Sequence, residues 1–125
     1  MNTFKMLTTI HFGENALDHL REIPYNRIMI IMDPFVYTSG LYKQITAHLD
    51  AVGKQYTLYS DVVPDAPLNK ITAGVKAFLD YKPDTIIAIG GGSAIDSSKT
   101  IREFALKINP YGKVGLIAIP TTSGT

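Results

Sequence analysis

A glycine-rich segment at residues 90–99 has the residue types and spacing best suited to binding an anion. It reads Gly-Gly-Gly-Ser-Ala-Ile-Asp-Ser-Ser-Lys and directly follows an apolar run. Glycines let a backbone approach a ligand closely, and a helix that begins after them presents free amide groups and the positive end of its dipole. The segment therefore predicts a site for a phosphate or pyrophosphate, with a purely structural turn as the alternative.

The spacing of this segment departs from two common nucleotide-binding motifs. No Gly-Lys-Ser or Gly-Lys-Thr occurs, so the segment is not a P-loop. Ile95 stands where the usual dinucleotide fingerprint has a small residue. Ser93 and Asp96 also predict a capping box, in which Ser93 is the N-cap and Asp96 returns to its amide. Such a box does not exclude a ligand role for either side chain.

Two other polar groups follow apolar runs. Asp33 comes directly after Ile-Ile-Met, and a carboxylate at a strand end can accept hydrogen bonds from a ribose diol and repel a 2′-phosphate, which favours NAD over NADP. A helix or turn cap beside Pro34 is the alternative. The hydroxyl-rich stretch 120–125 can bond phosphate, ribose or a carboxamide, or form a plain Ser/Thr turn. Its place beside the glycine segment favours a ligand.

Strands must carry these groups to one edge of a sheet. Three short, continuous apolar runs at residues 27–32, 85–89 and 115–119 predict strands that are buried on both faces. Residues 55–60 and 6–12 are weaker candidates for strands.

Helical periodicity separates these runs at residues 41–52, 68–79 and 94–108, the last segment opening at Ser93, with a shorter helix at residues 15–22. Gly53 and Pro83 are stop signals for the first two. The alternation predicts an α/β, Rossmann-like three-layer domain with a mainly parallel sheet, in which ligands bind beyond the carboxyl ends of the strands.

Composition limits the class of protein. A chain of 125 residues with 46% hydrophobic content can form at most one domain of usual size. Twelve basic against eleven acidic residues, without charge runs, argue against a nucleic-acid or membrane-surface footprint. The absence of cysteine excludes disulfides, Cys-ligated zinc and iron–sulfur clusters within this chain. With no secretory signal and no bilayer-length apolar run, we expect a soluble, cytoplasmic protein.

The histidines indicate no metal centre, since His11, His19 and His48 lack metal-ligand spacing. The chain also stops at Thr125, inside a loop-like stretch directly after an apolar run. We therefore expect residues 1–125 to be an incomplete domain from the front part of a longer protein.

Several motifs together resemble the iron-containing, or group III, alcohol dehydrogenases. They are Phe-Gly at 12–13, Asp33, Gly-Leu at 40–41, Val-Pro at 63–64, the Gly-Gly-Gly-Ser-x-x-Asp-x-x-Lys motif at 90–99 and Ile-Pro-Thr-Thr-Ser-Gly-Thr at 119–125. The resemblance covers nearly the whole chain in the family's order, and the last two motifs form a specific pair.

The resemblance implies an N-terminal Rossmann-like domain that binds NAD(P), with Asp33 on the adenosine ribose. Asp65 falls where relatives often have Asn near the adenosine. The same resemblance assigns the pyrophosphate and nearby groups to Gly91, Gly92, Ser93 and Asp96, and the phosphate and nicotinamide side to Thr121, Thr122 and Thr125.

The implied activity is reversible hydride transfer between NAD(H) and a small primary alcohol or aldehyde. The family places its Fe²⁺ or Zn²⁺ in a helical C-terminal domain, on one Asp and three His that this chain lacks, so we expect the chain alone to be inactive and its parent to be a homo-oligomer. The sequence most resembles those of propanol and ethanolamine-utilisation dehydrogenases. Alternatives are a relative of glycerol dehydrogenase or dehydroquinate synthase, or a non-catalytic nucleotide-binding module.

Overall fold

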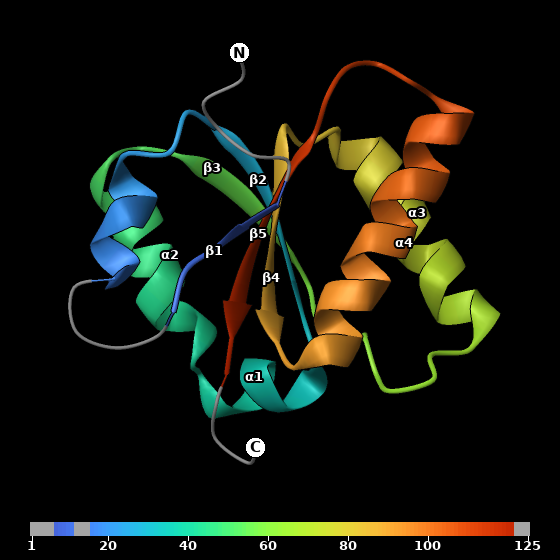
Figure 1. Cartoon of the computed structure of the whole chain (residues 1–125), viewed down its shortest axis with the longest axis horizontal. Coiled ribbons are helices and arrows are strands. Elements are labelled where there is room, and N and C mark those ends of the chain that lie inside the picture. Colours follow the sequence, from blue (N-terminus) through green and yellow to red (C-terminus); the bar gives the residue numbers. More distant parts are fainter. Residues whose placement is uncertain (1–6, 12–15, 122–125) are drawn as a thin grey trace.

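The computed structural model describes residues 7–11 and 16–121, which form a parallel sheet with helices on both of its faces (Figure 1). In chain order, the elements are β1 (Leu7–Thr9), the 3₁₀ helix η1 (Ala16–Arg21), β2 (Arg27–Met32), α1 (Pro34–Ser39), α2 (Tyr42–Ala51), β3 (Gln55–Tyr59), α3 (Leu68–Tyr81), β4 (Thr85–Gly90), α4 (Gly92–Ile108) and β5 (Gly115–Pro120). The α/β, three-layer prediction is confirmed.

Alternate side chains of the central strands fill two separate cores. Along β2, Ile28 and Ile30 pack into a core with residues of η1 and α2, whereas Met29 and Ile31 pack into a second core with residues of α3 and α4. A strand that is buried on both faces needs apolar side chains at every position, because successive side chains point to opposite faces. This is why the strongest strand signals in the sequence were continuous apolar runs.

The strand order in the described sheet is β1-β5-β4-β2-β3, and every neighbouring pair is parallel. The three continuous runs became β2, β4 and β5, which are the inner strands. The two weaker candidates became the edge strands: β3 matches its predicted range closely, and β1 is shorter than residues 6–12. Residues 6 and 12 lie outside the described part of the chain.

Three predicted helices are confirmed as α2, α3 and α4. Gly53, with φ of 75°, follows the C-cap of α2, and α3 ends at Lys82 in the left-handed region directly before Pro83. The short helix predicted at 15–22 is the 3₁₀ helix η1, and residue 15 is not described.

Helix α1 was not predicted from the sequence. Its signals are purely local: Asp33 is the N-cap, Pro34 occupies the first turn, and Gly40 ends the helix with φ of 81°. Because α1 has only six residues, it contains too few turns to display an apolar period.

Candidate cofactor-binding site

Strands β2 and β4 lie side by side, but the chain leaves their carboxyl ends in opposite directions. Met32 of β2 pairs with Ile89 of β4. The helix α2 that follows β2 packs against one core, and the helix α4 that follows β4 packs against the other, on opposite sides of the sheet (Figure 1). This is a topological switch point, where open α/β sheets have a crevice for a ligand.

Asp33 lies at this switch point as the N-cap of α1. Its Oδ1 accepts a hydrogen bond from the backbone N–H of Val36 at 2.8 Å, so the capping interpretation is confirmed. Its Oδ2 lies 3.4 Å from the position that a Cβ would take on Gly90. The carboxylate that caps α1 therefore lies close to the glycine-rich turn. Its predicted role in binding a ribose stays a prediction.

The three glycines where β4 ends and α4 begins have different physical reasons to be glycine. Gly90 has φ of 143°, and a Cβ there would lie 3.1 Å from the Cβ of Ala94, so the fold itself requires glycine. At Gly91 and Gly92 a Cβ would meet nothing within 4 Å, and neither has a positive φ. The described chain does not need glycine at these two positions, whereas a group that approaches the backbone closely would.

The predicted capping box at the start of α4 is wrong. The N-cap is Gly91, with φ of −87° and ψ of −165°, and no side chain caps the helix there. The backbone N–H of Ile95 bonds the carbonyl of Gly91 at 3.3 Å, so the helix begins before Ser93 and places that residue inside the first turn. The first amide groups of α4 thus lack a side-chain cap, which suits an anion at this helix end.

A groove of about 330 Å³ lies beside this helix end. The β3–α3 loop contributes Asp65 and Ala66 to its lining. The remaining lining residues come from α3 and α4: Ile71, Ser93, Asp96, Ser97 and Thr100. Asp65, Ser93 and Asp96, three of the residues predicted to bind the cofactor, are therefore brought together by the fold. The lining is rich in hydrogen-bond acceptors and hydroxyl groups, which suits donors such as ribose hydroxyls.

Thr121 follows β5 and reaches the same end of the sheet. Its backbone N–H donates to the carbonyl of Gly90 at 3.1 Å, continuing the ladder in which Gly90 pairs with Pro120. Thr122 and Thr125, which are also predicted to bind the cofactor, lie outside the described residues.

Sequence reasoning missed Ser97 and Thr100 as groove residues. They follow Ser93 and Asp96, respectively, at a spacing of four, and therefore extend the same stripe along α4. Helical periodicity applied to hydroxyl groups rather than to apolar ones could have identified both.

The described residues contain no group of three or more His, Cys, Asp or Glu side chains that could hold a metal ion.

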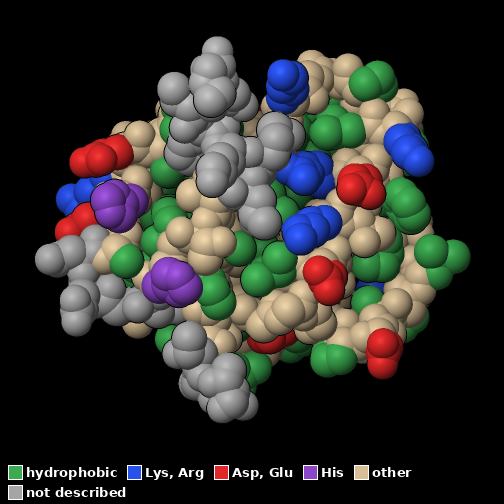
Figure 2. All heavy atoms as spheres, in the orientation of Figure 1, with side chains coloured by type: hydrophobic (Ala, Val, Ile, Leu, Met, Phe, Trp, Pro, Cys, Tyr) green, Lys and Arg blue, Asp and Glu red, His purple; other side chains and the backbone are tan. Residues whose placement is uncertain are grey.

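Charges of both signs are interspersed over the face that carries α4 (Figure 2). Within the ranges that the structure describes, no helix is both long and apolar enough to cross a bilayer.

The family model for iron-containing alcohol dehydrogenase matches residues 8–125. The chain belongs to this family. A relative named 1-propanol dehydrogenase PduQ, from Citrobacter freundii, is 34% identical over 100% of the chain, which spans 33% of the relative's length. The chain thus spans about a third of the length of the curated relatives that it matches first.

Solved structures support the Rossmann-like fold of the iron-containing alcohol dehydrogenase chain. The enzyme of that type from Thermococcus thioreducens superposes with a TM-score of 0.77 at 22% identity, covering 97% of this chain and 37% of the other. An NADH-dependent butanol dehydrogenase A from Thermotoga maritima gives a TM-score of 0.77 at 19% identity, covering 100% of this chain and 35% of the other.

Proposed function

We propose that this chain is the cofactor-binding part of an NAD-dependent, metal-dependent alcohol dehydrogenase that interconverts a small primary alcohol and its aldehyde. The observation that carries the proposal is the closeness of the Asp33 carboxylate to the turn at Gly90, at the switch point between β2 and β4. A dinucleotide needs a ribose acceptor and a close approach to backbone amides, and Asp33 and the turn at residues 90–92 would supply them.

The roles proposed for the side chains are those that the family resemblance implies. Asp33 accepts hydrogen bonds from the adenosine ribose, and Asp65 lies on the adenosine side. Gly91 and Gly92 leave room for the pyrophosphate at the start of α4, where the helix dipole and amide groups favour an anion. Ser93 and Asp96 line the adjoining groove, and the phosphate and nicotinamide side belongs to Thr121, Thr122 and Thr125.

Charge favours NAD over NADP at this crevice. A carboxylate beside the adenosine ribose repels a 2′-phosphate, and Asp65 and Asp96 add negative charge to the neighbouring groove. The resulting discrimination is electrostatic and should weaken as salt is added.

The cofactor, once bound, supplies hydride chemistry. This chain's residues bind and orient the dinucleotide. In this proposal the metal and the substrate pocket belong to other parts of the parent enzyme, as the family resemblance implies. We extend the proposal to a cytoplasmic, homo-oligomeric parent, and to no catalysis by this chain alone.

Binding of NADH and NADPH to the chain by ligand-observed NMR tests the proposal. Gly92→Val should abolish binding, because the side chain would fill the space reserved for the pyrophosphate. Gly112→Val is the matched control, since a Cβ at Gly112 also meets nothing within 4 Å and that residue lies at the opposite end of the sheet, before β5. A folded chain that binds neither dinucleotide, or loses binding equally in both variants, would contradict the proposal.

A further inference from the structure

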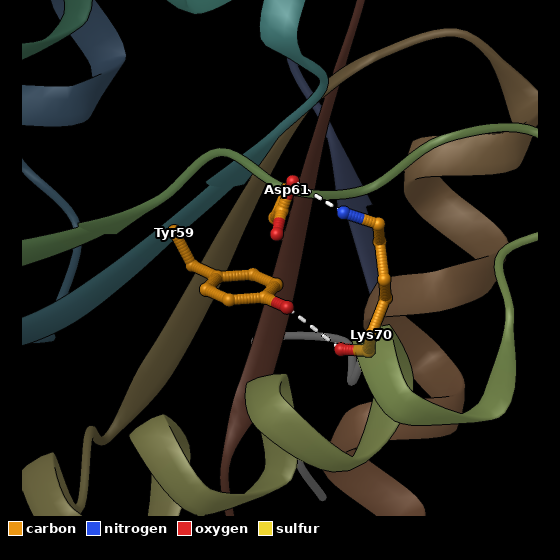
Figure 3. Close-up of polar contacts among 3 residues, drawn as sticks. All are labelled: Tyr59, Asp61 and Lys70. Carbon is orange, nitrogen blue, oxygen red and sulfur yellow. Dashed lines mark hydrogen bonds and ion pairs between the residues drawn. The ribbon is translucent and has the colours of Figure 1, made fainter.

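Lys70, near the start of α3, makes two contacts with the end of β3 and the loop that follows it (Figure 3). Its Nζ lies 2.9 Å from Oδ1 of Asp61, and its backbone carbonyl accepts a hydrogen bond from Oη of Tyr59 at 2.7 Å. Lys70 therefore connects α3 both to Tyr59, the last residue of β3, and to Asp61, in the loop that follows β3.

The loop at residues 60–67 carries one wall of the candidate groove. Its Val62 is only 2% exposed and packs into the core shared with α3 and α4. Beyond Val62 the loop turns outward, and Asp65 adopts φ of 50°, in the left-handed region. Asp65 and Ala66 then form the wall that faces α4. The position of this wall depends on what holds the loop to α3.

The Tyr59 ring is well placed to be a fixed support. A Cβ on Gly74 would lie 3.3 Å from Cε2 of Tyr59, so the ring packs closely on the α3 backbone. Burial, with a smaller contribution from Asp61, raises the pKa of Tyr59. The hydroxyl therefore stays protonated at neutral pH and continues to donate its hydrogen bond to the backbone carbonyl of Lys70.

We propose that Lys70 is a positioning residue of the cofactor groove, which holds the β3–α3 loop through Asp61 and Tyr59 so that Asp65 faces the first turns of α4. The inference rests on the proposed function, because it makes adenosine-side affinity depend on this ion pair. Lys70 lines no part of the groove itself and acts through the loop.

A matched ion pair on the same helix provides the control. Lys76 and Asp80 of α3 lie 3.2 Å apart at a spacing of four, with side chains that are 77% and 70% exposed. The pair joins α3 only to itself, and within the described residues its hydrogen bond and ion pair do not involve the 60–67 loop. Lys76→Met removes the same charge from the same helix as Lys70→Met without releasing the loop.

The experiment uses the 125-residue chain, its fold checked by circular dichroism, and measures two properties. Backbone amide NMR without cofactor reports the loop, and calorimetry reports affinities for NADH, AMP and NMN. Lys70→Met should shift the amides of residues 62–66 and weaken NADH and AMP binding about two- to fivefold, the range expected of a partly exposed ion pair. NMN affinity should not change, and Lys76→Met should leave all three affinities within twofold of the parent chain.

Charge exchange tests the pair directly. Asp61→Lys combined with Lys70→Asp should restore at least half of the affinity that either single change removes. Equal losses in Lys70→Met and Lys76→Met, an equal loss for NMN, or strictly additive effects at Asp61 and Lys70 would overturn the inference. If Lys70→Met moves the loop amides while NADH affinity stays unchanged, the inference fails and the proposed function stands. If the folded parent chain binds no dinucleotide, the proposed function fails, and the inference fails because it rests on that function.

Discussion

Gly74 of α3 lies directly against Ile101 of α4. A Cβ built on Gly74 would come within 2.5 Å of Cδ1 of Ile101, so the absence of a side chain is what allows the two helices to approach this closely. The candidate groove opens between the first turns of these helices, and its shape depends on this contact.

Gly74→Ala should therefore destabilise the chain although alanine favours helices. The gain in helix propensity is about 1 kcal/mol, and the cost of overpacking a core is about 1–3 kcal/mol, so we expect a net loss of about 1 kcal/mol. Ile101→Val removes the clashing Cδ1. In that background Gly74→Ala should instead be neutral or stabilising in urea unfolding. The same sign in both backgrounds would show that Ile101 is not the obstacle.

Asp33 can be tested for its two roles separately. Asn caps helices about as well as Asp but carries no charge. Ala neither caps a helix nor carries a charge. Asp33→Asn should keep the free energy of unfolding within about 0.5 kcal/mol, and Asp33→Ala should lower it by about 0.5–2 kcal/mol. If the carboxylate rejects a 2′-phosphate, Asp33→Asn should reduce the preference for NADH over NADPH by about tenfold, or about 1.4 kcal/mol. An unchanged ratio of the two affinities would leave Asp33 as a cap alone.

Thr85, at the start of β4, is fully buried, and its Oγ1 has no hydrogen-bond partner among the described residues. A buried hydroxyl without a partner costs about 1–3 kcal/mol, so Thr85→Val should raise the free energy of unfolding, by up to about 1 kcal/mol. Thr46 provides the comparison, because its buried hydroxyl donates to the carbonyl of Lys43 at 3.3 Å. Thr46→Val should be destabilising by about 0.5–1.5 kcal/mol in the same urea titration. Equal signs for the two variants would argue that Thr85 has a partner in solution.

Ionisation of Tyr111 should lower the free energy of unfolding of the chain at alkaline pH. Its Oη donates to the carbonyl of Pro83 at 2.7 Å, and burial, followed by the nearby negative charge of Asp84, raises the pKa of Tyr111 to about 12. Because this pKa is above the ordinary value of 10.0, the contribution is complete below pH 10 and is lost as the pH rises towards 12. Tyr111→Phe should flatten the pH dependence of thermal unfolding between pH 10 and 12. In an ultraviolet titration of tyrosine ionisation, the same variant should lack the transition at the highest pH. If neither the unfolding curve nor the titration curve changes, the raised pKa does not belong to Tyr111.

The sequence predicted the inner strands and the long helices because their signals are local and repeated. The apolar run of residues 85–89 is buried throughout, and the stripe of α3 spans several turns. That Asp33 and Gly90 lie at the same edge of a parallel sheet also followed from general rules of α/β folds, once the strands were placed.

The misplaced start of α4 and the missing α1 have different causes. Ser93 had the residue type of an N-cap, but the extended backbone at Gly91 begins the helix two residues earlier. Helix α1 consists of little more than its caps. The contacts of Lys70 could not be predicted at all, since they join a strand end, a loop and a helix through positions that share no periodic pattern.

The outermost pairing in the sheet affects how the chain can fold as it is synthesised. Leu7 of β1 pairs with Leu116 of β5, so β1 finds its partner only after every described element between the two strands has been synthesised. Until then, β5 is not available to β1, while β2, β3 and β4 can already assemble on their own helices. Such long-range closure slows folding in general. The joining of β1 to the sheet should therefore be the last and slowest step of folding, and a synthesis that pauses before β5 would leave β1 without its partner.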